Sequence, residues 1–278
     1  KTYDNNRDVN IFLATQTPSI AIDRLFTLAG NATIESNGTY GSPVMGRTDN
    51  QAAIVFSNTG DIAYLGTGGR TLNLGGNSNG DNQINLRLVD NPLGGALTVS
   101  RSGYGAFWTL GNQTNAYTGP TIIQGGALIA IDGGSLPTTS NLQFAQDWAG
   151  GSFFQSSGTF DRAIGAGADQ WQAGPNTGFA GFAADRTKLV VDWTGQGLIW
   201  GNTDGSASFL KGATLSLNSG NSLAEVEIRG NFEIRPAALV NGLTASIVSG
   251  GTQTLSGVQN LASVSVGQLV SGPGIPAN

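Results

Sequence analysis

The sequence has neither cysteine nor histidine among its 278 residues. Disulfides, cysteine nucleophiles, zinc sites with nitrogen and sulfur ligands, and histidine-based catalytic triads are therefore excluded. Charge is also scarce, because only 11 % of the residues are Asp, Glu, Lys or Arg, and the net charge is −5. A nucleic-acid-binding surface needs clustered positive charge, so we expect no nucleic-acid partner.

Long apolar runs are missing as well. The longest runs span residues 52–56 and 127–131, whereas a membrane-spanning helix needs about 20 consecutive apolar residues. We therefore expect no membrane span in this segment. The chain starts at Lys1 and ends in a series of turn residues, which we interpret as two cuts in a larger chain.

Glycine is abundant, with 43 residues, and it separates short segments that are rich in β-branched and aromatic residues. Examples are 53–56, 71–74, 97–99 and 107–110. Short strands that recur about every ten residues are typical of an all-β protein. The number of strands favours a parallel β-helix, a solenoid with three short strands in each coil of about 22 to 25 residues. We expect strands to pair in parallel across one coil, with Gly and Asn at the corners.

Particular strings then indicate a family. The string NAYTGPTIIQGGAL at 115–128, together with GALTVSRSGYG at 95–105 and WTL at 108–110, resembles the autotransporter-associated β-strand repeat. The core of the match is 95–131, and weaker similarity covers about 20–235. The resemblance implies a right-handed parallel β-helix in a secreted bacterial protein at the cell surface, with no catalytic residues to carry over.

The resemblance also suggests the domain organisation. We expect one β-helix over 1–235 and the start of a second, small β module or an end coil over 236–278, because the C-terminal string is similar to a module of long repetitive surface and fibre proteins.

Residues 224–235 alternate between apolar and polar side chains, as in a strand with one face in the core and one outside. We expect Ala224, Val226, Ile228, Phe232 and Ile234 to point inward. The outward set carries mixed charge, which suits a contact with another copy of the chain; it comprises Glu225, Glu227, Arg229, Glu233 and Arg235.

Paired carboxylates leave an enzymatic alternative open. Glu225 and Glu227 lie about 7 Å apart along one strand face, a separation that fits the acid and base of a β-helical polysaccharide lyase or hydrolase. Arg229 follows on the same face and favours a ladder of ion pairs instead. The neighbours Asp161 and Arg162, like Asp185 and Arg186, are interpreted as local ion pairs.

Other motifs carry little chemistry. Residues 76–80 match the G-x-S-x-G pattern of hydrolases, but that pattern requires a histidine base. Asp81 stands alone in a calcium-like glycine segment, and the segment beginning at Asp4 lacks the glycine and glutamate that a calcium loop needs. We therefore expect no metal and no cofactor.

Aromatic residues concentrate between 144 and 200, where four of the five tryptophans lie. Most of them are expected to fill the core. Trp148, Phe153 and Phe154 are surrounded by Gly and Ser, so we consider these three as candidate contacts for a glycan or a protein partner.

Together these features predict a non-catalytic structural segment of a secreted bacterial surface protein, which serves as a stalk, an adhesin or a building block of an extracellular layer or fibre. Other surface proteins, glycans or further copies of the chain are the expected partners. A β-helical carbohydrate-active enzyme and a self-assembling filament subunit are the alternatives.

Overall fold

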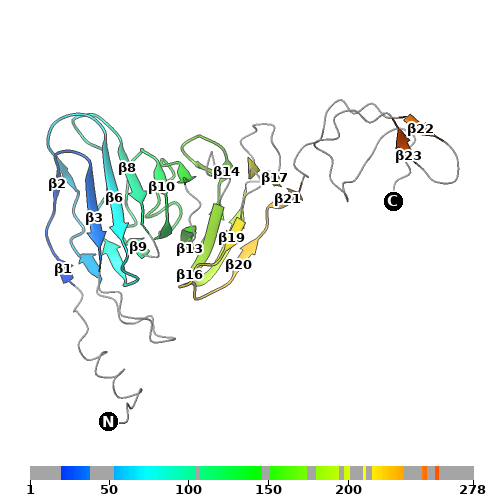
Figure 1. Cartoon of the computed structure of the whole chain (residues 1–278). Coiled ribbons are helices and arrows are strands. Elements are labelled where there is room, and N and C mark those ends of the chain that lie inside the picture. The colour runs from blue at the N-terminus through cyan, green and yellow to red at the C-terminus, as the bar shows by residue number, and fades with distance from the viewer. Residues whose placement is uncertain are drawn as a thin grey trace, which may run out of the picture.

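The computed structural model describes residues 20–37, 53–103, 107–145, 151–173, 180–193, 197–200, 209–210, 215–234, 246–248 and 254–256. These residues contain no helix, and about 53 % of them are in strands. The prediction of an all-β chain is therefore confirmed (Figure 1).

One long parallel sheet runs through the whole molecule and has nine strands. Eight of them follow one another in the order β1-β4-β7-β9-β11-β13-β16-β19, and β20 also pairs with β16. Their bounds are β1 Ile20–Ile22, β4 Ile54–Phe56, β7 Asn82–Ile84, β9 Phe107–Leu110, β11 Gly126–Ile129, β13 Ser152–Asp161, β16 Ala180–Asp192, β19 Leu215–Leu217 and β20 Val226–Ile228. Each new strand comes from the next stretch of the chain, so the sheet grows in sequence order.

A second parallel sheet accompanies the first and has seven strands. In sequence order they are β3 Ala32–Ser36, β6 Arg70–Gly76, β8 Leu97–Arg101, β10 Thr121–Ile123, β12 Leu142–Phe144, β14 Ala163–Ile164 and β15 Gln170–Gln172. Short contacts form a third side, where β2 Thr27–Leu28 pairs with β5 Ala63–Tyr64 and isolated bridges join Asp61 to Arg87 and Val89 to Ala116.

The chain visits the three sides in turn, which defines a parallel β-helix. From β8 it passes to β9, then to the third side at Ala116, and returns to the seven-stranded sheet at β10. Phe107 pairs with Ala127, 20 residues later, and Arg70 pairs with Leu97, 27 residues later. The predicted coil length is thus confirmed in the central coils. Coils nearer the ends are longer, since Ala32 pairs with Leu72, 40 residues later.

Other strands lie outside these sheets. β17 Gly197–Trp200 pairs in parallel with β18 Phe209–Leu210 and with β21 Asn231–Ile234. β22 Ser246–Val248 and β23 Thr254–Ser256 form an antiparallel pair, unlike the β-helix strands. They lie in the predicted second module, whose boundary near residue 236 stays a prediction. The right-handed winding likewise rests on the family resemblance.

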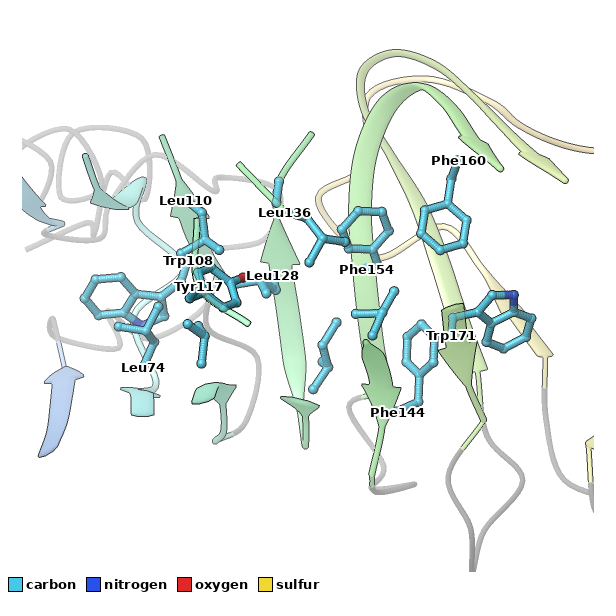
Figure 2. Packing of buried hydrophobic residues seen from close by; sticks show 14 of the residues in the cluster. Leu74, Trp108, Leu110, Tyr117, Leu128, Leu136, Phe144, Phe154, Phe160 and Trp171 are labelled. Carbon is cyan, nitrogen blue, oxygen red and sulfur yellow. The ribbon is translucent and has the colours of Figure 1, made fainter. Parts of the chain in front are cut away.

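The core is a stack of apolar side chains between the sheets (Figure 2). Pairing in register places Trp108, Leu128, Phe154 and Phe182 in one row along the nine-stranded sheet, all with no exposed surface. Around Phe182 the core becomes aromatic, because its ring lies 5.3 Å from those of Phe160 and Trp171. The prediction that most aromatics of this region fill the core is confirmed for the described residues.

Buried asparagines join one coil to the next at the corners. Asn115 accepts a hydrogen bond from the Leu88 N–H at 2.8 Å and donates one to the Ser135 carbonyl at 2.9 Å. It thereby satisfies backbone groups in the coils on either side. Asn91 similarly donates to the carbonyls of Gly66 and Gly68. An amide side chain both donates and accepts, which explains why asparagine suits these corners.

Arg162 is buried, contrary to the expectation of an exposed local pair with Asp161. Its side chain is 1 % exposed and forms an ion pair with Asp132, at 2.6 Å between Nη2 and Oδ1. Its Nη1 donates to the Ser140 carbonyl at 2.6 Å. The expectation was wrong because the partner comes from the preceding coil, 30 residues away in sequence. The Asp185–Arg186 pair does form, at 3.8 Å, with Arg186 exposed.

Candidate functional site

A charged face lies on the outside of β16 and β20; we define it as Lys188, Glu225, Glu227 and Arg229. Leu189 is paired with Val226 and Val191 with Ile228, which sets the register of the two strands. Val226 and Ile228 pack against the core, while Glu225 and Arg229 are exposed and Glu227 is half-buried. The predicted alternation is confirmed for residues 225–229, because successive strand side chains point to opposite faces.

Two further residues of the predicted outward set fall beyond this description. Glu233 belongs to β21, but its side chain lies outside what the structure describes, as do those of Phe232 and Ile234. Arg235 lies outside the described residues altogether. Whether this face contacts another subunit stays a prediction.

The charges of this face neutralise one another across the two strands. Lys188 Nζ lies 2.9 Å from Glu225 Oε1 and also contacts Glu227 Oε2. Arg229 Nε donates to Glu227 Oε1 at 2.6 Å. Two cations therefore face two carboxylates, and the sequence-adjacent strand positions are linked to the preceding coil by Lys188.

These contacts shift the ionisation of the face. Hydrogen bonds from Arg229 and Lys188 lower the pKa of Glu227 to about 2. The same contacts raise the pKa of Lys188, chiefly through Glu227, and the pKa of Arg229. A catalytic acid needs a pKa near the working pH, so Glu227 is poorly suited to donate a proton at neutral pH. The geometry favours the ion-pair ladder over the acid–base pair.

We predict that this ladder makes stability depend on pH. Because the pKa of Glu227 falls from 4.5 to about 2 on folding, its contribution is complete above pH 4.5 and is lost as the pH falls toward 2. The unfolding midpoint of Glu227→Gln should lie below that of the wild type at pH 7, and the two should converge near pH 2.

Urea unfolding followed by circular dichroism between pH 7 and pH 2 measures this difference. Molar salt should also narrow it, because exposed ion pairs are screened. A constant difference across the whole pH range would contradict the assignment.

The aromatic candidates separate into three cases. Trp148 lies outside the described residues. Phe153 is half-buried on β13 and pairs with Ala127, on the face opposite to the core. Phe154 has no exposed surface, and its ring lies 5.2 Å from that of Phe160. The prediction that Phe154 contacts a ligand is therefore wrong.

The error has a simple physical cause. Adjacent residues of a strand point to opposite faces, so at most one of two neighbouring phenylalanines faces outward. The surrounding Gly and Ser residues give no alternation from which to choose between them. Phe153 alone keeps an outward position within the described part of β13, and its role as a contact stays a prediction.

Sequence reasoning missed where large aliphatic side chains emerge. Seven are substantially exposed in the described residues: Ile20, Leu25, Leu65, Leu93, Ile131, Leu217 and Leu223. Ile20 and Leu217 lie in the first and last strands of the long sheet. The open ends of a β-helix were the signal that could have found them.

Within the described ranges, no three acidic side chains lie close enough to hold a metal ion. No described segment is a helix long and apolar enough to cross a membrane.

The fold defines a class of protein: a parallel β-helical solenoid with a stacked core and outward side chains that pair among themselves. Over 141 residues, 50 % of the chain, the sequence is 35 % identical to the adhesin BmaC autotransporter of Brucella suis biovar 1 (strain 1330). The aligned stretch spans 4 % of the length of that relative. The resemblance to autotransporter proteins is thus supported at the level of an autotransporter adhesin.

No family model matches the chain. No solved structure matches it either. The assignment to the autotransporter-associated repeat itself therefore stays a prediction.

Proposed function

We propose that this chain is a non-catalytic, β-helical segment of a bacterial surface adhesin, which extends and displays binding surface away from the cell. The observation that carries the proposal is the continuous stack of coils in a sequence that is similar to an autotransporter adhesin. Glycans and proteins of a host or neighbouring cell are the proposed partners.

The β-helix supplies reach with few residues. The eight successive strands from β1 to β19 rise roughly 34 Å at about 4.8 Å per strand. Each coil contacts mainly its neighbours, so length is added without a larger core. The buried aromatic stack and the asparagine bridges hold the coils in fixed register, which supports a role as a stiff display element.

The outward surface supports binding rather than catalysis. On the charged face every charge has an opposite partner, which lowers the pKa of Glu227 instead of placing it in the working range of a general acid. A surface of paired charges and polar side chains is suited to complementary protein or glycan contacts.

Display on a non-adherent bacterium tests the adhesive function. We expect cells that carry the chain on a surface anchor to adhere to epithelial monolayers several-fold better than cells with the anchor alone. Gly94→Ala and Gly95→Ala form a matched pair of controls, since the first should preserve the fold and the second should destroy it. A folded, displayed chain that gives no adhesion above the anchor would overturn the proposal.

An assay on polysaccharides tests the non-catalytic assignment separately. Purified chain incubated with pectin or alginate should release no unsaturated or reducing ends. Turnover that disappears in Glu225→Gln or Glu227→Gln would establish the enzymatic alternative instead.

A further inference from the structure

One row of inward side chains runs along the entire nine-stranded sheet and is covered everywhere except at its ends. The register places these residues in line: Ile20, Ile54, Asn82, Trp108, Leu128, Phe154, Phe182 and Leu217. From Asn82 to Phe182 they have no exposed surface, whereas Ile20 is 57 % exposed and Leu217 is 46 % exposed. The two ends of the core row are therefore apolar and uncovered.

The backbone is also open at these two places. In the part of the chain that the structure describes, β1 pairs only with β4, and β19 pairs only with β16. The Ile20 N–H donates to the Ala53 carbonyl and the Asn218 N–H donates to the Phe182 carbonyl. Because N–H and C=O groups alternate sides along a strand, those of Ala21 and Leu217 point to the open edges.

Neither edge carries the charges that usually block edge-to-edge pairing. β1 reads Ile-Ala-Ile and β19 reads Leu-Ser-Leu. β20, which also borders β16, is flanked by Glu225 and Arg229. Charged side chains at an edge disfavour the addition of another strand, so β1 and β19 are the permissive edges of this sheet.

We propose that β1 of one copy of the chain adds in parallel to β19 of a second copy. Ile20 then covers Leu217, which continues the core row, and the Ala21 N–H faces the Leu217 carbonyl. The occupant is a second copy because the two edges belong to one sheet and complement each other in strand direction, register and side-chain character. This inference goes beyond the adhesive function and does not depend on it.

The symmetry of this contact determines the product. Edge β1 meets edge β19, so the interface is heterologous and leaves one free edge at each end of the pair. Addition can repeat without closing, and end-to-end chains result. A shaft assembled in this way keeps the outer faces of both sheets accessible.

Sedimentation of the purified chain, with substitutions at the two ends, tests the contact. The weight-average mass of the wild type should rise with concentration to at least about twice that of the monomer. Ile20→Lys and Leu217→Lys should each stay monomeric, because an unpaired charge at the contact is unfavourable. Leu65→Lys and Leu93→Lys, which change comparably exposed aliphatics, should associate like the wild type.

Mixing the two end variants gives the sharpest result. Ile20→Lys keeps a functional β19 edge and Leu217→Lys keeps a functional β1 edge, so their mixture should form one-to-one dimers and stop there. A wild type that stays monomeric, or a mixture that stays monomeric while the wild type associates, would overturn the proposal.

Cross-linking provides a readout that does not depend on affinity, since the natural chain has no cysteine. In the double variant Ile20→Cys/Leu217→Cys, neighbouring parallel strands would hold the new thiols within disulfide range. Oxidation should give a ladder of multimers on a non-reducing gel, whereas Ile20→Cys/Leu93→Cys should not. Equal ladders from both double variants would refute the specific pairing of β1 with β19.

Discussion

Replacement of Gly95 by alanine should destabilise the β-helix by about 4 kcal/mol or more, at the upper end of what single substitutions do. A Cβ atom at this position would lie 2.1 Å from the backbone carbon of Gly68 and 2.2 Å from the backbone nitrogen of Gly69. Backbone atoms of the preceding coil cannot rotate away as a flexible side chain can. The φ angle of +124° adds strain, because L side chains rarely adopt it.

The neighbouring glycine is a matched control. Gly94 has a φ of +100°, and a Cβ atom there would meet nothing within 4 Å. Gly94→Ala should therefore show only the conformational penalty, about 1 kcal/mol. Urea unfolding of both variants, followed by circular dichroism, measures the difference. Equal losses would mean that close approach of the coils is not what requires Gly95.

Replacement of Asp132 by asparagine should reduce stability by about 3 kcal/mol, because it removes one partner of a buried ion pair. Arg162 is 1 % exposed and Asp132 is 13 % exposed. Without the carboxylate, the guanidinium keeps its bonds to carbonyls of the preceding corner and a longer contact of 3.7 Å with Asp169. Those groups bear less negative charge or lie in solvent, so the buried cation remains poorly compensated.

An exposed pair offers the comparison. Asp61 and Arg87 also join two coils, at 3.1 Å, but their side chains are 56 % and 36 % exposed. Water compensates either group when the other is removed, so Asp61→Asn should change the free energy of unfolding by less than about 1 kcal/mol. Thermal or urea unfolding at neutral pH is the measurement. Similar losses in the two variants would show that burial does not set the strength of the Arg162 pair.

The sequence alone determined the class of fold because that information is local and repeated. Glycine and asparagine at short intervals exclude long helices and permit tight corners, and β-branched segments between them form strands. Alternation over 225–229 likewise fixed which side chains point outward, since burying Glu225 or Arg229 unpaired would be far more costly than exposing them.

Only the tertiary structure decided what depends on contact between coils. It placed Phe154 inside and Phe153 outside, a choice that two adjacent aromatics leave undetermined. It also placed Arg162 beside Asp132 rather than Asp161, because a charge can be buried where an earlier coil presents a carboxylate and several carbonyls.

The ends of the sheet belong to this second category. Ile20 and Leu217 have ordinary apolar strand sequences around them, and nothing local distinguishes them from Leu128 or Phe182. Their exposure follows from the position of their strands at the two edges of the sheet, where the stack of coils supplies a neighbour on one side only. Strand pairing between distant residues creates that difference, so the order of the coils had to be known before these side chains were recognised as a contact surface.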